Sequence, residues 1–244
     1  MKVLVVGAGS MGRWLARTLR DHADASVAFA DTDRDAADAA AAAVGGRAVP
    51  TDIRERFDVV AVAVPMPVAD VAIEEYAPLS DGAVVDVTGQ MADPLAAMAA
   101  AAPDRQRASL HPLFAPANAP GSIAVVTAAG GEWVDAVVDA LVAAGNEPFE
   151  TTAPEHDTAM KSVQAAAHAA VIAYAAATAE VPDRFHTPVS SGMESLVEQV
   201  LGGEAHVYAD IQRTFDGAEA VAAAAREIAD ADHEAFAALY EELS

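Results

Sequence analysis

Short apolar runs alternate with longer amphipathic stretches over roughly the first 150 residues of the chain. The short runs are rich in β-branched residues, as buried strands are, and the longer stretches repeat apolar positions at helical spacing. The expected strands are Lys2–Val6, Ser26–Ala30, Val59–Val64, Ala83–Val87, Ile123–Thr127 and Pro148–Thr152. The expected helices are Met11–Asp21, Arg34–Val44, Pro67–Tyr76, Pro94–Ala101 and Glu132–Ala144. Strands that alternate with helices predict right-handed crossovers, and hence an α/β fold with a doubly wound parallel sheet.

After Pro154 the strand pattern stops, and an all-α region is expected. Its predicted helices are Glu155–Glu180, Ser190–Gly202 and Ala218–Leu243, separated by Pro182, Pro188 and Gly202-Gly203. The first of these helices carries alanine on nearly every face, and a helix that is apolar all round is normally buried. We therefore expect a sheet domain, 1–152, followed by a helical domain, 153–244, that forms a homodimer with a second copy of the chain.

A glycine-rich turn joins the first expected strand to the first expected helix, in Gly7-Ala8-Gly9-Ser10-Met11-Gly12. This is the dinucleotide-binding fingerprint of a Rossmann-type domain. In it Gly7 allows the tight turn, Gly9 lets the pyrophosphate approach the backbone, and Gly12 permits close packing of helix on sheet. The phosphates would lie at the helix N-terminus, beside Ser10 and Met11.

An acidic residue, Asp31, closes the second expected strand, 19 positions after Gly12. A carboxylate there accepts hydrogen bonds from the ribose hydroxyls and repels a 2′-phosphate, so NAD is the expected cofactor. Arg34 is near enough in sequence to bind a 2′-phosphate, which leaves NADP open. Val64 and Pro65 end the third long strand, where they are expected to line the nicotinamide side of the site.

The composition narrows the classes of partner. The chain has 244 residues, with 37 Asp and Glu against 14 Lys and Arg, a formal net charge of −23. Such a surface repels phosphates, so neither nucleic acid nor an anionic membrane is expected as a partner. Hydrophobic residues make up 53 %, which excludes an acidic disordered chain. Only Lys2 and Lys161 are lysines, and with the carboxylate excess this suggests a halophilic protein.

Neither an export signal nor a membrane span is expected. The alanine-rich run Ala165–Ala179 is short and contains His168 and Tyr174, which is typical of a buried helix rather than a span. A cytoplasmic protein is therefore expected. The absence of cysteine excludes disulfides, thiolate metal sites and a cysteine nucleophile, and no cluster of residues has the spacing of a metal site.

His111 is the expected catalytic residue. It lies in Ser109-Leu110-His111-Pro112-Leu113-Phe114-Ala115-Pro116, where two prolines restrict the backbone around it. The segment is interpreted as a connection between two strand–helix units, and loops of this kind often carry function on a rigid scaffold. A neutral imidazole there could accept a proton at cellular pH.

Three motifs carry a family resemblance. The run His-Pro-Leu-Phe-Ala-Pro at 111–116 resembles the His-Pro-Met-Phe-Gly-Pro signature of the prephenate dehydrogenases of tyrosine biosynthesis. Glu155-His156-Asp157, with Gln164 and His168 further on, resembles the Glu-His-Asp…Gln…His helix of that family. Tyr208-Ala209-Asp210-Ile211 resembles its Tyr-Ala-Asp-Ile run. Together with the glycine-rich turn, the motifs agree in order and spacing over nearly the whole chain.

This resemblance implies an NAD-dependent oxidative decarboxylation of prephenate, an anionic small molecule, to 4-hydroxyphenylpyruvate. It implies that NAD⁺ takes a hydride from ring C4 while His111 accepts the proton of the C4 hydroxyl, and that loss of CO₂ makes the ring aromatic. His156, Gln164 and His168 would bind the substrate or secure the interdomain cleft. Asp157 could instead interact with the dipole of its own helix, and His168 could be a packed interface residue.

The turn after the fourth long strand departs from the family pattern. The family usually has a serine, followed two residues later by a lysine, where this chain has Gly89 and Met91. Thr88 is therefore the candidate for the hydroxyl that assists the catalytic histidine, and Gly89 is expected to face the substrate.

The expected cation for the ring carboxylate is also missing. Ser191 stands where bacterial members of the family carry an arginine. A dianionic substrate needs a cation, so Lys161, Arg184 or Arg213 would take its place, and Lys161 itself replaces a residue that is usually small.

Other functions remain open at this point. Arogenate, which has an amine in place of the side-chain ketone of prephenate, is an alternative substrate. Lys161-x-x-Gln164 is similar to the Lys-x-x-x-Asn helix of the β-hydroxyacid dehydrogenases, with a spacing that differs by one. A nucleotide-binding regulator without catalysis is a further alternative, although His111 and Gln164 argue against it.

Overall fold

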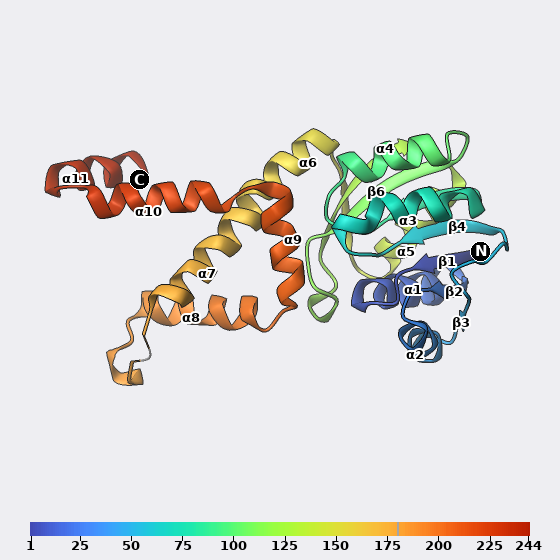
Figure 1. Cartoon of the computed structure of the whole chain (residues 1–244), viewed down its shortest axis with the longest axis horizontal. Coiled ribbons are helices and arrows are strands. Elements are labelled where there is room, and N and C mark those ends of the chain that lie inside the picture. Colours follow the sequence, from blue (N-terminus) through green and yellow to red (C-terminus); the bar gives the residue numbers. More distant parts are fainter. Residues whose placement is uncertain (180) are drawn as a thin grey trace. The chain divides into compact units, whose positions relative to one another are not determined.

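The computed structural model describes residues 1–179 and 181–244. The chain forms two compact units, Met1–Asp157 and Thr158–Ser244. The first contains a sheet with helices on both faces, and the second is helical throughout its described part (Figure 1). The boundary expected from the sequence, between 152 and 153, lies at the start of helix α6 (Ala153–Met160), and the division into two units falls within that helix.

The sheet orders its strands β3-β2-β1-β4-β5-β6-β7-β8. These are β1 (Lys2–Val6), β2 (Ser26–Ala30), β3 (Arg47–Ala48), β4 (Phe57–Val62), β5 (Ser80–Asp86), β6 (Gln106–Pro112), β7 (Ser122–Ala129) and β8 (Glu147–Glu150). All neighbours are parallel except β6 and β7, which are antiparallel. The predicted doubly wound parallel sheet is therefore confirmed, with one antiparallel pair at β6 and β7. This pair is antiparallel because segment 113–121, which joins the two strands, is too short to cross the sheet.

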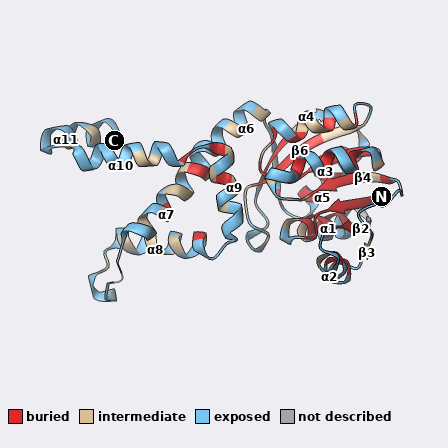
Figure 2. Ribbon diagram, viewed as in Figure 1, coloured by how far each residue is buried: buried red, intermediate tan, exposed pale blue. Residues whose placement is uncertain are grey.

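Helices cover both faces of this sheet and divide its core in two. Helices α1 (Ser10–Ala23), α2 (Arg34–Val44) and α5 (Glu132–Ala143) pack on one face, and α3 (Ala69–Tyr76) and α4 (Ala92–Ala101) pack on the other. Within β1, Val3 and Val5 belong to the first core and Leu4 and Val6 to the second. Because both faces are buried, the strands are continuous apolar runs rather than alternating ones (Figure 2).

Two strands were not expected from the sequence, and one of them carries the catalytic candidate. The segment interpreted as a connection, Gln106–Pro112, is the strand β6. The sequence pattern does not indicate this strand, because its buried positions include the polar residues Ser109 and His111, which interrupt the apolar run. The two-residue strand β3 is too short to produce a pattern.

The helical unit differs from expectation in three places. It consists of the end of α6, a π-helical segment (Lys161–Ala166), α7 (Ala167–Ala177), α8 (Pro188–Leu201), α9 (Ala205–Phe215), α10 (Ala218–Asp230) and α11 (His233–Glu242), with a short 3₁₀ turn, Asp183–Phe185, before α8. The predicted helix Glu155–Glu180 contains the π-helical segment and ends at Ala177, and Glu180 itself lies outside the described residues. The predicted helix Ala218–Leu243 is two helices, because Asp232 caps a new one by accepting hydrogen bonds from the backbone of Glu234 and Ala235. Helix α9 was not predicted.

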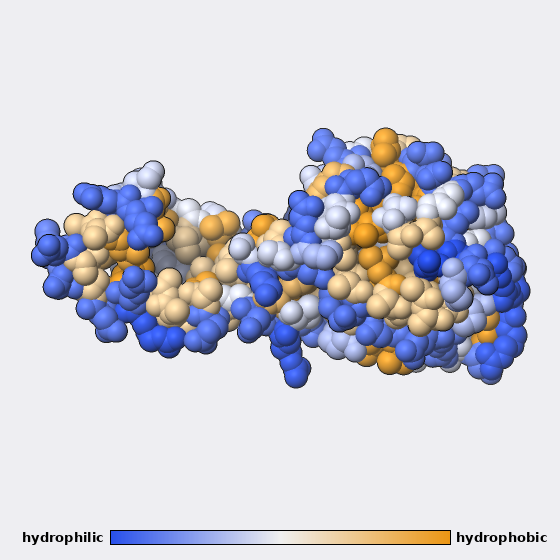
Figure 3. All heavy atoms as spheres, turned by 90° about the horizontal axis from the view of Figure 1, so that it is seen from above, coloured by the Kyte–Doolittle hydropathy of each residue, from blue (hydrophilic) through white to orange (hydrophobic). Residues whose placement is uncertain are grey.

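The helical unit buries little by itself. Neither α10 nor α11 has a buried residue, although both carry large apolar side chains such as Ile228, Phe236 and Tyr240. Hydrophobic residues therefore reach the surface of this unit between charged ones, as the space-filling view shows (Figure 3). Over the described ranges, no helix is both long enough and apolar enough to span a membrane.

Candidate active site

The glycine-rich turn after β1 has the geometry that its sequence predicts. Gly7 has a φ of +102°, and a Cβ at this position would lie 2.3 Å from the carbonyl oxygen of Ala63. A Cβ on Gly12 would lie 2.1 Å from the carbonyl oxygen of Gly7. A Cβ on Gly9 would meet nothing within 4 Å. Gly7 and Gly12 are therefore required by the fold, whereas Gly9 leaves open space beside the backbone.

The N-terminus of α1 fits an anionic group. Its N-cap residue, Gly9, offers no side-chain hydrogen bond, and no acidic residue lies in the first turn. Ser10 is exposed and Met11 is partly exposed at the start of the helix. The first amides of α1 thus keep their affinity for a negative charge, and the absent side chain at Gly9 is where a pyrophosphate could approach.

Asp31 is hydrogen-bonded to the backbone of the glycine-rich turn. Its Oδ2 accepts a hydrogen bond from the backbone of Ala8 at 2.7 Å, and its Oδ1 accepts one from Asp33 at 2.8 Å. Each carboxylate oxygen can accept a second hydrogen bond, so ribose hydroxyls remain possible partners. Arg34 forms an exposed ion pair with Asp38 at 3.1 Å. The acidic neighbours of Asp31 disfavour a 2′-phosphate.

The other candidates of the sheet unit lie at the same edge of the sheet. Val64 and Pro65 follow β4, Thr88 and Gly89 follow β5, and His111 is the penultimate residue of β6. Carboxyl ends of parallel strands meet at one edge, which is where ligands bind in open α/β sheets. A Cβ on Gly89, whose φ is +151°, would lie 3.5 Å from Nε2 of His111, so Gly89 faces that nitrogen.

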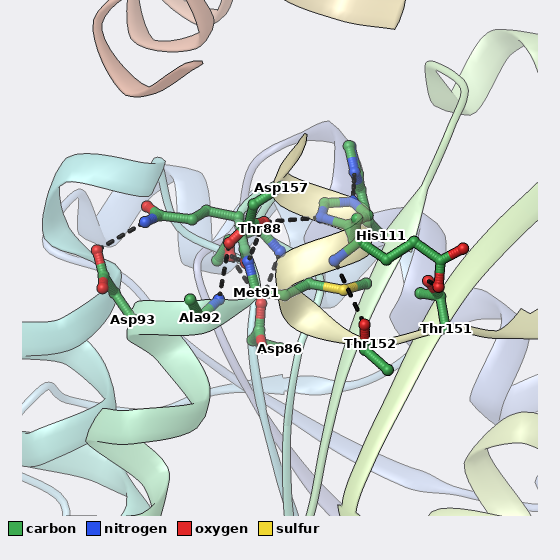
Figure 4. A network of polar contacts seen from close by, with 12 residues as sticks. Asp86, Thr88, Met91, Ala92, Asp93, His111, Thr151, Thr152 and Asp157 are labelled. Carbon is green, nitrogen blue, oxygen red and sulfur yellow. Dashed lines mark hydrogen bonds and ion pairs between the residues drawn. The ribbon is translucent and has the colours of Figure 1, made fainter. Parts of the chain in front are cut away.

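A chain of three side chains begins at His111. Its Nδ1 lies 2.8 Å from Nε2 of His156, and Nδ1 of His156 lies 2.8 Å from Oδ1 of Asp157 (Figure 4). An ionised carboxylate only accepts hydrogen bonds, so His156 donates from Nδ1 and, when neutral, accepts at Nε2. His111 must then donate from Nδ1, which assigns its Nε2 the unprotonated, basic form.

His156, expected to bind substrate or to secure the interdomain cleft, is engaged by protein groups in this structure. The side chain of His156 is only 1 % exposed, and both of its ring nitrogens are engaged by protein groups. Its Nε2 contacts His111, and its Nδ1 contacts Asp157.

Asp157 joins this chain to a second helix. Its carboxylate accepts hydrogen bonds from the backbone amides of Met91 and Ala92, at 3.2 and 3.3 Å, at the start of α4. Burial favours the neutral acid, but the hydrogen bonds from His156, Met91 and Ala92 outweigh it and hold the pKa of Asp157 below its usual value. Asp157 therefore does interact with a helix dipole, but with that of α4 rather than that of its own helix.

Burial has the opposite consequence for His111. The residue is 7 % exposed, and burial together with the neighbouring His156 lowers the pKa of His111 to about 3, against a smaller opposing effect of Asp157. The ring is thus neutral at physiological pH, as a proton acceptor must be.

A buried carboxyl, that of Asp86, lies near the hydrogen-bonded side chains of His111, His156 and Asp157. Asp86 is fully buried, and its Oδ1 accepts hydrogen bonds from the backbone and the hydroxyl of Thr88, at 3.0 and 2.7 Å. Burial raises the pKa of Asp86 to about 6. The Thr88 hydroxyl proton is therefore engaged by Asp86, and this hydroxyl can offer only its lone pairs elsewhere.

The remaining candidates belong to the helical unit. Lys161 is exposed at the first position of the π-helical segment, and Gln164 is partly buried on the same segment. His168 packs edge-on against Tyr208, with ring centroids 4.9 Å apart. Arg184 lies in an exposed 3₁₀ turn, where its guanidinium stacks over the ring of Phe185 at 4.9 Å. Segments of π-helix are frequent at functional sites.

Sequence reasoning missed Asp86 and Ser109, and it misjudged Asp157. Asp86 and Ser109 are neighbours in register on β5 and β6, and both are fully buried. A polar residue inside a strand otherwise made of valines is the signal that could have indicated them. Within the described ranges, no group of three His, Asp or Glu side chains could hold a metal ion.

Comparison with known proteins shows similarity along the whole chain. A model of the family described as NADP oxidoreductase, coenzyme F420-dependent, matches residues 2–99. A 4-amino-4-deoxyprephenate dehydrogenase of Streptomyces pristinaespiralis is 33 % identical in an alignment of 275 positions, gaps included, which covers 99 % of this chain and 89 % of that protein. A probable arogenate/prephenate dehydrogenase of Methanocaldococcus jannaschii is 25 % identical in an alignment of 226 positions, gaps included, which covers 86 % of this chain and 50 % of that protein.

Solved structures share the fold. A prephenate dehydrogenase from Aquifex aeolicus, in complex with hydroxyphenyl propionate and NAD⁺, has a TM-score of 0.74 at 14 % identity, and the match covers 99 % of this chain and 95 % of that one. An arogenate dehydrogenase from Synechocystis has a TM-score of 0.66 at 15 % identity, covering 94 % and 90 %. At these identities the likeness concerns the fold.

Proposed function

This chain belongs to the prephenate dehydrogenase family, and on that premise we propose that it oxidises and decarboxylates prephenate to 4-hydroxyphenylpyruvate with NAD. The relative that is 33 % identical over nearly its full length carries the family assignment. The observation that carries the reaction is His111, a buried neutral imidazole whose Nδ1 is hydrogen-bonded to His156, so that Nε2 is the basic nitrogen.

In the proposed mechanism His111 removes a proton from the C4 hydroxyl of the substrate at Nε2. Gly89 faces Nε2 and places no side chain of its own against this nitrogen. NAD⁺, when bound, accepts the hydride from ring C4. The chain itself supplies position and a fixed proton acceptor.

We assign the cofactor to the edge formed by β1, β2 and β4. Gly7, Gly9 and Gly12, together with Ser10 and Met11, would hold the pyrophosphate at the start of α1. Asp31 would accept hydrogen bonds from the ribose, and its carboxylate is the reason for preferring NAD to NADP. Val64 and Pro65 would line the nicotinamide side.

The carboxylates of the substrate need cations, and the sheet unit offers none beside His111 among the residues proposed for the site. We propose that the helical unit supplies the substrate contacts through Gln164, His168 and a cation, either Lys161 or Arg184. The exposure of Lys161 on the π-helical segment that also carries Gln164 favours Lys161.

4-Amino-4-deoxyprephenate is a second candidate substrate beside prephenate. The relative with the 33 % match is named for 4-amino-4-deoxyprephenate, which carries an amine at C4 where prephenate has a hydroxyl. Gly89 stands where the family usually has a serine, so the position before Nε2 lacks a hydroxyl that would select the C4 group. Arogenate is the third substrate to test, because it appears in the names of the proteins from Methanocaldococcus and Synechocystis.

We also propose that the protein is cytoplasmic and that two copies form a homodimer through their C-terminal helices. The apolar side chains that α10 and α11 leave exposed support the dimer.

A turnover assay in concentrated KCl tests the proposal with prephenate, arogenate and 4-amino-4-deoxyprephenate, each with NAD and with NADP. We expect the highest kcat/KM with prephenate and NAD. His111→Asn should lower kcat by roughly 10²- to 10⁴-fold, because it removes the proton acceptor, while NAD affinity stays the same. His22→Asn, an exposed residue of α1, is the matched control. A fully active His111→Asn variant, or a wild type inactive on all three substrates, would refute the function.

A further inference from the structure

The position of His111 raises a problem for its role as a base. Burial and the neighbouring His156 both oppose a positive charge on this ring, so the pKa of His111 lies far below neutrality. An acceptor of such low basicity would return the proton to the substrate alkoxide almost at once. The structure must therefore place the positive charge elsewhere once the proton has been taken.

We propose that His111, His156 and Asp157 form a proton relay that moves the positive charge one ring away from the substrate. This inference rests on the proposed function. As the hydroxyl O–H bond breaks, the proton binds Nε2 of His111, and the proton on Nδ1 of His111 passes to Nε2 of His156. His111 ends neutral in its other tautomer, and His156 becomes an imidazolium beside the carboxylate of Asp157. One proton enters the chain of rings, and the hydride leaves with the nicotinamide cofactor.

The distances allow each transfer. Both hydrogen bonds of the relay, between the two rings and between His156 and Asp157, are 2.8 Å long. The two rings are nearly perpendicular, with an interplanar angle of 72°, so they meet through their nitrogens rather than by stacking. No water or further side chain has to enter between the members of the chain.

The charges around His156 favour the final state. Asp157 accepts hydrogen bonds from two backbone amides at the start of α4, and these keep it ionised. Its Oδ1 faces Nδ1 of His156 directly. Asp86 also interacts with His156 electrostatically. His111, the third titratable neighbour, is neutral both before and after the transfer. A positive charge on His156 therefore meets carboxylates instead of apolar groups.

His156 is thus a positioning residue, because it reaches the substrate only through His111. In the resting state it sets the tautomer of His111, and during the reaction it receives the charge. A residue that only filled space would do neither, which gives the two roles measurable consequences.

The test is chemical rescue of His156→Ala in the full-length protein. We expect kcat with prephenate to fall by roughly 10²- to 10⁴-fold, the range of a lost general base, while KM and NAD affinity change little. Added imidazole should restore kcat in proportion to its concentration. His22→Ala, at an exposed site, should keep full activity and ignore imidazole. A His156→Ala variant with wild-type kcat would overturn the relay.

Asp157→Asn tests the destination of the charge. Removing the carboxylate makes protonated His156 less stable, so the acidic limb of the kcat/KM profile should move to lower pH and the plateau should fall. If His156 only supported the fold, the limb would keep its position, and that result would overturn the relay. Binding of NAD to both variants shows whether they are folded.

A measurement without turnover separates this inference from the proposed function. In NMR of wild-type protein with isotope-labelled histidine, His111 should be protonated at Nδ1 and unprotonated at Nε2. A proton on Nε2 of His111 would overturn the relay whatever the substrate is. If the tautomer is as expected and none of the three substrates reacts, the fault lies with the proposed function.

Discussion

Asp86 is a carboxyl group placed where its charge is costly. It lies fully buried at the end of β5, where it accepts two hydrogen bonds from Thr88 and lies opposite the buried Ser109 of β6. Burial raises its pKa from 3.8 to about 6, in spite of the Thr88 hydrogen bonds. Because the native state binds this proton more tightly than the unfolded chain, Asp86 adds stability at low pH and loses that contribution as the pH rises through 6.

Asp86→Asn should therefore stabilise the protein at neutral pH. An amide keeps an oxygen for the Thr88 hydrogen bonds and carries no charge. At about 1.4 kcal/mol per pKa unit, the gain at pH 8 should be roughly 2–3 kcal/mol, and it should shrink toward pH 4. Thermal unfolding of both proteins across this range gives the measurement. A difference in midpoint that does not vary with pH would show that the ionisation of Asp86 costs the fold nothing.

At the scale of elements, the π-helical segment Lys161–Ala166 is held from one side. Gln212 of α9 donates a hydrogen bond from Nε2 to the carbonyl oxygen of Ala165 at 2.7 Å. Gly217, between α9 and α10, lies so close that a Cβ there would be 2.4 Å from the backbone nitrogen of Ala166. The shape of the segment that carries Lys161 and Gln164 therefore depends on contacts made some 50 residues later in the chain.

Two glycines of the helical unit should respond in opposite ways to alanine. Gly217→Ala must displace backbone atoms of the π-helical segment, so it should destabilise this unit by more than 1 kcal/mol, roughly the scale of an overpacked core. Gly192 lies within α8, where a Cβ would meet nothing within 4 Å, so Gly192→Ala should stabilise by about 0.5–1 kcal/mol. Denaturant unfolding of both variants checks the pair. Equal effects would mean that Gly217 is not confined by the segment.

At the scale of the whole molecule, the charge and the exposed apolar residues bear on assembly. The net charge of −23 opposes association of two copies unless salt screens it. Of the two lysines, Lys2 already pairs with Glu55 at 2.8 Å. The helices that we propose for the dimer interface expose large apolar side chains, among them Phe236 at 47 %. Concentrated salt favours both the burial of such residues and the approach of like charges.

Light scattering should therefore give twice the protomer mass in molar KCl, and a lower average mass at low salt. Phe236→Asp should shift the equilibrium toward the monomer, because it places a charge in the proposed interface. Val142→Asp is the control, since Val142, which is 54 % exposed, is a similarly exposed apolar residue of α5 in the other unit. If both variants keep the wild-type mass, the C-terminal helix α11 is not part of an interface.

The sequence by itself determined the elements whose pattern is local. The strands β1 and β2 and the helix α2 have the predicted bounds, because a continuous apolar run or an Asp33 cap followed by an alanine-rich stretch is decided within a few residues. The glycine-rich turn was equally predictable. Any strand–turn–helix of this kind packs backbone atoms against the positions of Gly7 and Gly12, so a Cβ has no room there. The motif around His111 indicated the reaction through a resemblance.

Only the tertiary structure decided what surrounds His111. The sequence did not reveal that His111 lies on a strand, because β6 buries polar residues against its neighbours and so lacks an apolar pattern. Nor could it show that His156, 45 residues later, takes the hydrogen bond of His111, or that Asp157 serves a helix that begins at Ala92. Hydrogen bonds between distant segments leave no periodic trace in a sequence, since they depend on which strand ends the fold brings to one edge.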